Sequence, residues 1–418
     1  MGMTAIEKIL ARAAVDRDAV RPGDLVVVRV DTAVLYDNNF TPGLWRDVLK
    51  VHDPDRVVVV MDHRVPSMDI NSATGWKTAR AFVEKFGIER HHLFGENQGI
   101  SHVVVAENGY ALPGTVLVCG DSHTCSAGAF NCAARGTGYP DMVYAVTKGE
   151  TWFRVGETVR YEFTGAMPAN VSTKDVFLFL ADHYGEHAGM NVEFGGPGIA
   201  SLSIDARRTL TTMGAELSAE FATFEPDEAM LDYVRARNDA PFEAQYPDAD
   251  ADYADIRTVD LAAMEPLVAL PDAVLNNAKP AGAVTGVRLD QCFVGSCANG
   301  TIEDIATVAQ VLKGRKVAKG TRFLVTPGTQ RIYLEAVKAG YVETILEAGA
   351  VFTPATCGAC SGAHMGVLGP DEACITASTR NFKGRMGDNS AKIYMGSPAT
   401  VAASAVAGEI SDPTPFLG

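Results

Sequence analysis

Two apolar stretches that each end in an acid–histidine pair constrain the fold of this chain most. Arg56–Met61 is apolar after its first residue and leads into Asp62–His63, and Thr115–Gly120 leads in the same way into Asp121–His123. Unbroken apolar runs predict strands covered on both faces, as in parallel sheets. Open α/β sheets place ligand-binding groups at the carboxyl ends of their strands. Each pair alone is equally compatible with a solvated turn, because loops gather polar residues.

The rest of the chain alternates between helical and strand patterns, which predicts an α/β fold. We expect helices at residues 4–15, 43–51, 73–86, 173–184, 205–218, 301–313, 328–340, 343–348 and 398–408. We expect further strands at 24–31, 323–327 and 349–352, and an antiparallel pair within 151–165. No glycine-rich dinucleotide fingerprint or P-loop follows any predicted strand.

Composition excludes several classes of function. The chain has 418 residues and a net charge of −15, which argues against a nucleic-acid or membrane-surface partner. The amino terminus lacks the apolar core of a signal peptide, and no run is long enough to span a membrane. We therefore expect a cytoplasmic protein, in which the eight cysteines stay reduced and available to metals.

Three of these cysteines lie in two glycine-rich segments. Cys297 stands in Gly-Ser-Cys-Ala-Asn, and Cys357 and Cys360 stand in Thr-Cys-Gly-Ala-Cys-Ser-Gly. A zinc half-site or a redox pair is the alternative for a lone CxxC motif. A one-plus-two arrangement suits a cuboidal iron–sulfur cluster in which one iron has no protein thiolate and is open to substrate. Cys119, Cys125, Cys132, Cys292 and Cys374 are expected to be structural.

The polar residues suit one reaction. The Asp62–His63 and Asp121–His123 pairs offer imidazoles whose basicity a carboxylate raises, as general acid catalysis requires. Arg380 and Arg385 lie in one glycine-containing loop and can converge on a carboxylate, although a surface ion pair is the alternative for either alone. With a Lewis-acidic iron, these groups predict reversible dehydration of a hydroxy acid.

The ordered motifs resemble the aconitase superfamily, and within it the large subunits of 3-isopropylmalate dehydratase and homoaconitase. The resemblance runs nearly end to end. It is carried by five segments: Val59–Pro66, Cys119–Phe130, Gly295–Asn299, Cys357–Gly366 and Arg380–Gly387.

This resemblance implies a role for each candidate residue. Cys297, Cys357 and Cys360 would hold a 4Fe-4S cluster with one labile iron. Three acid–histidine pairs would surround it. They are Asp62 with His63, Glu193 with His102, and Asp121 with His123. Ser122, Arg380 and Arg385 would bind the substrate.

The resemblance also implies the domain organisation and the partner. We expect three α/β/α subdomains around a central iron–sulfur site, at about 1–160, 161–275 and 276–418, without the family's swivelling domain. That domain would be a separate small subunit, and it would carry the serine that abstracts the proton.

Three functions follow as hypotheses. The first is a hydro-lyase of the 3-isopropylmalate dehydratase or homoaconitase type. The second is a simple hydratase of a maleate- or dimethylmalate-like acid, motivated by departures from the family pattern at Val103, Cys125–Ala127 and Thr379. The third, a cluster-free RNA-binding protein, conflicts with the acidic charge, because phosphate contact needs clustered Lys and Arg.

Overall fold

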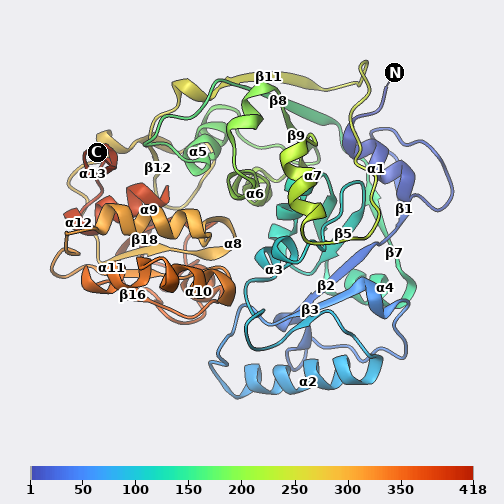
Figure 1. Ribbon diagram of the computed structural model, residues 1–418, viewed down its shortest axis with the longest axis horizontal. Coiled ribbons are helices and arrows are strands. Elements are labelled where there is room, and N and C mark those ends of the chain that lie inside the picture. Colours follow the sequence, from blue (N-terminus) through green and yellow to red (C-terminus); the bar gives the residue numbers. More distant parts are fainter. Residues whose placement is uncertain (1, 418) are drawn as a thin grey trace.

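The computed structural model describes residues 2–417 and contains three mainly parallel sheets with their helices, arranged around a common centre (Figure 1). The predicted α/β class is therefore confirmed. Short segments from each part meet at the centre, where α3 (Ser101–Glu107), α6 (Ile204–Met213) and α8 (Ser296–Asn299) lie near one another.

The first sheet has five parallel strands in the order β4-β3-β2-β5-β6. Their bounds are β2 (Thr32–Tyr36), β3 (Val57–Val60), β4 (His91–His92), β5 (Val116–Cys119) and β6 (Ala133–Gly136). Its helices are α2 (Ile70–Phe86), α3 and α4 (Tyr139–Lys148). All four valines of β3 are buried, which explains why its apolar run is unbroken.

An antiparallel ribbon and a helix accompany this sheet. The ribbon pairs β1 (Leu25–Arg29) with β7 (Glu150–Arg154), and α1 (Ala5–Ala13) packs against β1. Burial alternates along β1, so the predicted buried strand at 24–31 is half-exposed.

The second sheet has four parallel strands in the order β10-β9-β8-β11. They are β8 (Thr158–Thr164), β9 (Asn191–Gly195), β10 (Ala222–Phe224) and β11 (Asp255–Asp260), with helices α5 (Thr173–His183), α6 and α7 (Glu228–Arg235).

The third sheet has seven strands in the order β13-β12-β18-β17-β14-β15-β16. They are β12 (Leu267–Ala269), β13 (Ala278–Pro280), β14 (Gln291–Val294), β15 (Arg322–Val325), β16 (Val351–Phe352), β17 (Ala373–Thr376) and β18 (Lys392–Gly396). Only the pairings of β12 are antiparallel. The helices are α8, α9 (Ile302–Leu312), α10 (Gln330–Lys338), α11 (Tyr341–Glu347), α12 (Pro398–Ala407) and α13 (Thr414–Leu417).

Two predicted elements are wrong. The antiparallel pair expected within 151–165 does not form, because β7 pairs with β1 and β8 joins a different, parallel sheet. Residues 43–51 form turns and irregular backbone in place of a helix. The division into subdomains at about 1–160, 161–275 and 276–418 remains a prediction. Within residues 2–417, no helix combines the length and apolarity needed to cross a bilayer.

Candidate active site and cysteine centre

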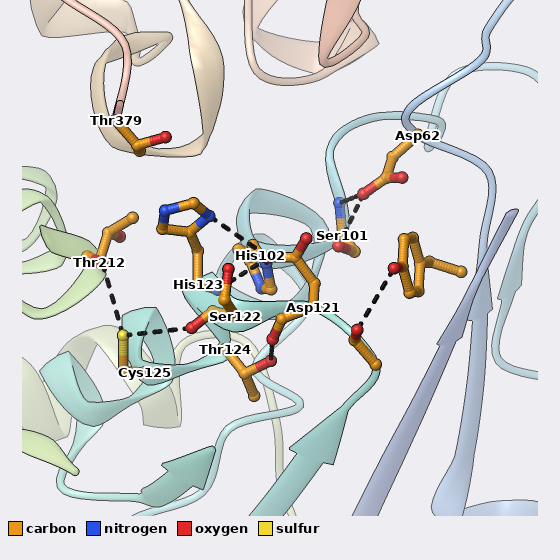
Figure 2. A network of polar contacts seen from close by, with 12 residues as sticks. Asp62, Ser101, His102, Asp121, Ser122, His123, Thr124, Cys125, Thr212 and Thr379 are labelled. Carbon is orange, nitrogen blue, oxygen red and sulfur yellow. Dashed lines mark hydrogen bonds and ion pairs between the residues drawn. The ribbon is translucent and has the colours of Figure 1, made fainter. Parts of the chain in front are cut away.

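The carboxyl ends of β3 and β5 hold the two acid–histidine segments. These strands flank β2 in a parallel sheet, so their ends lie at the same edge. Figure 2 shows Asp62, His102, Asp121 and His123 converging on one region, with Thr379 entering from another part of the chain.

Asp62 and His63 form a buried pair at the end of β3. The Asp62 carboxylate accepts hydrogen bonds from the backbone N–H and hydroxyl of Ser101, at 3.0 and 2.7 Å (Figure 2), and lies 2.5 Å from Nδ1 of His63. Burial alone would lower the pKa of His63, but attraction to Asp62, Asp37 and Asp121 raises the pKa to about 10. The pair therefore holds a proton on the imidazole.

Asp37 is a third member of this group that sequence reasoning missed. Its Oδ1 lies 3.7 Å from Nδ1 of His63, is buried, and has no hydrogen-bond partner. Burial, followed by repulsion from Asp62, raises the pKa of Asp37 to about 7. The signal available in the sequence was a carboxylate directly after β2, the strand between the two recognised ones.

His102 pairs with Asp121 and not with Glu193. Nε2 of His102 lies 2.8 Å from Oδ1 of Asp121, which also accepts the backbone N–H of His123 at 2.8 Å. Although burial works in the opposite direction, these two histidines hold the pKa of Asp121 well below its usual value. One carboxylate thus orients two imidazoles.

The prediction that Glu193 pairs with His102 is wrong. Glu193 lies in β9, where its carboxylate accepts the backbone N–H of Ile6 at 3.1 Å and the hydroxyl of Tyr253 at 2.9 Å. The buried Glu193 side chain thus connects α1 and Tyr253 to the second sheet. It does not line the cavity that contains the cysteines.

Glu216 is the glutamate that meets a site histidine. Its Oε1 lies 3.0 Å from Nε2 of His123 and accepts from Nε of Arg380 at 2.7 Å. Arg380 also donates to the hydroxyl of Ser122 at 3.0 Å. Burial would raise the pKa of Glu216, but His123 and Arg380 hold it below its usual value. The sequence signal was a carboxylate in the glycine-containing turn after α6.

One cavity of about 220 Å³ brings the cysteines and the polar residues together. Its lining includes Asp62, His63, His102, Asp121, His123, Cys297, Cys357, Cys360, Ser361, Thr379, Arg380 and Arg385. Every predicted site residue except Ser122 and Glu193 lines it, and Ser122 contacts Arg380 as described above.

Local backbone structure presents the three thiols. Cys297 lies in α8, the short helix after β14. Cys357 directly precedes the 3₁₀ segment Gly358–Ser361, and Cys360 lies within it. Arg385 approaches Cys360, with Nη2 at 3.8 Å from Sγ, and the hydroxyl of Thr379 lies 3.7 Å from the same sulfur.

This donor set fits a multi-iron cluster. Among residues 2–417, the three sulfur atoms are not all within 4.8 Å of one another. A single ion would hold them closer together, because a zinc–sulfur bond is only about 2.3 Å long. Thiolates are the usual ligands of iron–sulfur clusters. Nε of Arg385 is buried beside them without a hydrogen-bond partner, so a further anionic or acceptor group fits there.

Of the departures from the family pattern, Thr379 lines the cavity, whereas Cys125 and Val103 are packed in the interior. The Cys125 thiol points toward the backbone carbonyls of Ser122 and Thr212 (Figure 2), and burial raises the pKa of Cys125 to about 12. Val103 is buried in the core of the third sheet. Neither side chain lines the cavity.

Comparisons with known proteins identify the family of this chain. The model of the aconitase family (aconitate hydratase) matches residues 41–279 and 272–408. The chain belongs to the aconitase family. A 3-isopropylmalate dehydratase large subunit of Mycolicibacterium smegmatis is 50% identical over 99% of this chain and 97% of its own length.

Two further relatives match over at least 99% of both chains. A 3-isopropylmalate dehydratase large subunit 1 of Methanopyrus kandleri is 41% identical over 100% of each chain. A protein named probable methanogen homoaconitase large subunit, of Methanothermobacter thermautotrophicus, is 41% identical over 100% of this chain and 99% of its own. The crystal structure of Thermococcus kodakaraensis aconitase X (holo-form) aligns at a TM-score of 0.48 and 12% identity, over 90% of this chain and 89% of that one.

Proposed function

We propose that this chain is the large, catalytic subunit of an iron–sulfur hydro-lyase that reversibly dehydrates a malate-like hydroxy acid of the 3-isopropylmalate or homoaconitate type. One observation carries the proposal, namely that a single cavity is lined by three cysteines, two buried acid–histidine systems and two arginines. The names of the similar large subunits support the substrate class.

Arg380 and Arg385 are proposed to bind substrate carboxylates. Both line the cavity, and a guanidinium fork matches a carboxylate. Glu216 and Ser122 fix the Arg380 side chain, so its remaining donors are presented in a defined direction. The Arg385 Nε atom is still free to donate to a bound group.

The histidines are proposed to manage protons. Asp62 and Asp37 contact Nδ1 of His63 and keep the imidazole protonated, so the proton on Nε2 is available for a leaving hydroxyl. His102 and His123, oriented by Asp121 and Glu216, can stabilise the departing water and the substrate oxygens.

Cys297, Cys357 and Cys360 are proposed to hold a 4Fe-4S cluster, which would supply a Lewis-acidic iron for the substrate hydroxyl. The wide spacing of the sulfurs and the unpaired Arg385 Nε support this assignment over a single-ion site.

A separate small subunit is proposed to complete the site. Relatives that match this chain over nearly their whole length are named large subunits. The family resemblance implies that the partner carries the swivelling domain and the serine that removes the carbon-bound proton. The simple hydratase of a maleate- or dimethylmalate-like acid is not favoured, because the similar proteins carry the dehydratase and homoaconitase names.

The test is anaerobic reconstitution of the chain with iron and sulfide, followed by assays with its small subunit. We expect cluster absorbance, turnover of 3-isopropylmalate or homoaconitate, and loss of both in Cys297→Ser. Cys292→Ser is the matched control, since Cys292 is buried in β14 and does not line the cavity. A wild-type chain that takes up no iron, or hydration of maleate alone, would overturn the proposal.

A further inference from the structure

Lys174 is a fully buried lysine behind the cysteine cavity. It lies in the first turn of α5 and has no solvent exposure. Its Nζ donates to the backbone carbonyl of Ser378 at 3.0 Å and to the thioether sulfur of Met213 at 3.3 Å. Within residues 2–417, no carboxylate oxygen lies within 4.0 Å of this ammonium.

Such a position is costly for a cation. Removing an ammonium from water without a paired anion is strongly unfavourable, and the first turn of a helix repels positive charge. Burial lowers the pKa of Lys174 to about 8, which still leaves the side chain mostly protonated at pH 7. A methionine would fill the same volume without this penalty, so the charge itself requires an explanation.

Nearby groups oppose the effect of burial on Lys174. Attraction to Asp304 raises the pKa of Lys174 most, and attraction to Cys297, Cys360 and Glu216 follows in that order. Asp304 already accepts hydrogen bonds from Thr301 and Asn299 at the start of α9, and Glu216 is neutralised by its contacts with His123 and Arg380. The contacts of the Cys360 sulfur are longer, at 3.8 Å from Nη2 of Arg385 and 3.7 Å from the Thr379 hydroxyl.

The backbone connects the lysine to the site. Ser378, whose carbonyl accepts from Lys174, precedes Thr379, whose hydroxyl lies 3.7 Å from the Cys360 sulfur. Arg385 lines the cavity and approaches the same sulfur directly. Lys174 does not line the cavity, and the Ser378–Thr379 backbone lies between its ammonium and the Cys360 sulfur.

We propose that Lys174 is a buried counter-charge for the iron–sulfur cluster, stabilising the anionic centre that the three cysteines form and favouring its reduced state. The inference rests on the proposed function, because it requires a cluster at these cysteines. Net charge near a cluster is one of the factors that set its reduction potential.

The experiment compares wild type, Lys174→Met and Lys174→Gln as reconstituted holoprotein and as apoprotein. Glutamine keeps an N–H donor for the Ser378 carbonyl and removes only the charge. Lys85→Met is the matched control, because the Lys85 ammonium also donates to a backbone carbonyl, that of Val48 at 3.2 Å, but lies in α2 away from the cysteines.

Two readouts separate charge from packing. In redox titrations followed by electron paramagnetic resonance, we expect the equilibrium constant for one-electron reduction of the cluster to fall about tenfold in both Lys174 variants. This corresponds to a reduction potential that is lower by about 59 mV. In the apoprotein, we expect both variants to melt at or above the wild-type temperature, because an unpaired buried charge is gone.

Two results would overturn the inference. One is a loaded cluster with the wild-type potential in both variants, and the other is apoprotein of both variants that is less stable than wild type or fails to fold. Failure of the wild-type chain to take up iron would instead overturn the proposed function, and this inference with it.

Discussion

At the scale of single residues, Glu216 links the proton-handling part of the site to the substrate-binding part. One of its carboxylate oxygens contacts both His123 and Arg380. In Glu216→Gln we expect turnover to fall by about a hundredfold or more and KM to rise, because His123 loses a charged partner and Arg380 loses the contact that fixes its direction. Steady-state kinetics of the reconstituted complex measure both effects.

Glu193→Gln is the matched control for this prediction. Glu193 is buried between Ile6 and Tyr253, and glutamine can replace both contacts. We expect near-normal turnover from this variant. Loss of turnover in Glu193→Gln with normal turnover in Glu216→Gln would contradict the assignment of the two glutamates.

The two glutamates also show where sequence reasoning reached its limit. Glu193 and Glu216 both stand in glycine-containing segments of the same α/β unit, so local pattern could not separate them. The structure separates them, because β9 directs Glu193 toward α1 and the turn after α6 directs Glu216 toward β5. Such a distinction depends on contacts between residues distant in sequence.

At the scale of elements, the strand-ending pairs were predictable and the strand partners were not. A buried strand such as β3 has an unbroken apolar run that marks both its position and the edge where Asp62 lies. Which strands pair with each other depends on the whole sheet. For this reason β7 and β8, although close in sequence, belong to different sheets. The strand β2, whose five residues are all buried, went unrecognised, and Asp37 directly after it was missed as well.

The turn between β14 and α8 gives a test at this scale. A Cβ atom on Gly295 would lie 2.9 Å from both the Phe293 ring and Cβ of Thr326, and 3.0 Å from the Thr326 carbonyl oxygen. Gly295→Ala must therefore displace the turn that carries Cys297, at a cost of about 1–3 kcal/mol. We expect a lower melting temperature and substoichiometric iron after reconstitution, measured by calorimetry and iron analysis.

A glycine in open surroundings provides the control. A Cβ on Gly282 would meet only a carboxylate oxygen of Asp412 at 3.7 Å, an ordinary contact distance. Gly282→Ala is expected to keep wild-type stability and iron content. Full iron occupancy in Gly295→Ala would contradict the view that this turn positions a ligand.

At the scale of the whole molecule, the cysteine segments hold the first and third sheets together. The backbone carbonyl of Asp62, after β3, accepts the N–H of Cys357 at 3.0 Å and the hydroxyl of Thr356 at 2.8 Å. Gln98 donates to the carbonyls of Met61 and Ala355, both at 3.1 Å. Contacts between Glu216 and Arg380 connect the second sheet with the third.

Because the proposed cluster ligands lie at these junctions, cluster loss should loosen all three units at the centre before it unfolds any of them. We expect amide hydrogen exchange to accelerate about tenfold or more on removal of iron at residues 60–63, 98–102, 356–361 and 378–385. Exchange in the β1–β7 ribbon should not change, because its strands contribute no cavity residue. Hydrogen-exchange mass spectrometry of holoprotein, apoprotein and Cys297→Ser measures this, and Cys297→Ser should match the apoprotein. Acceleration spread evenly over the chain would show instead that the centre and the sheets unfold as one unit.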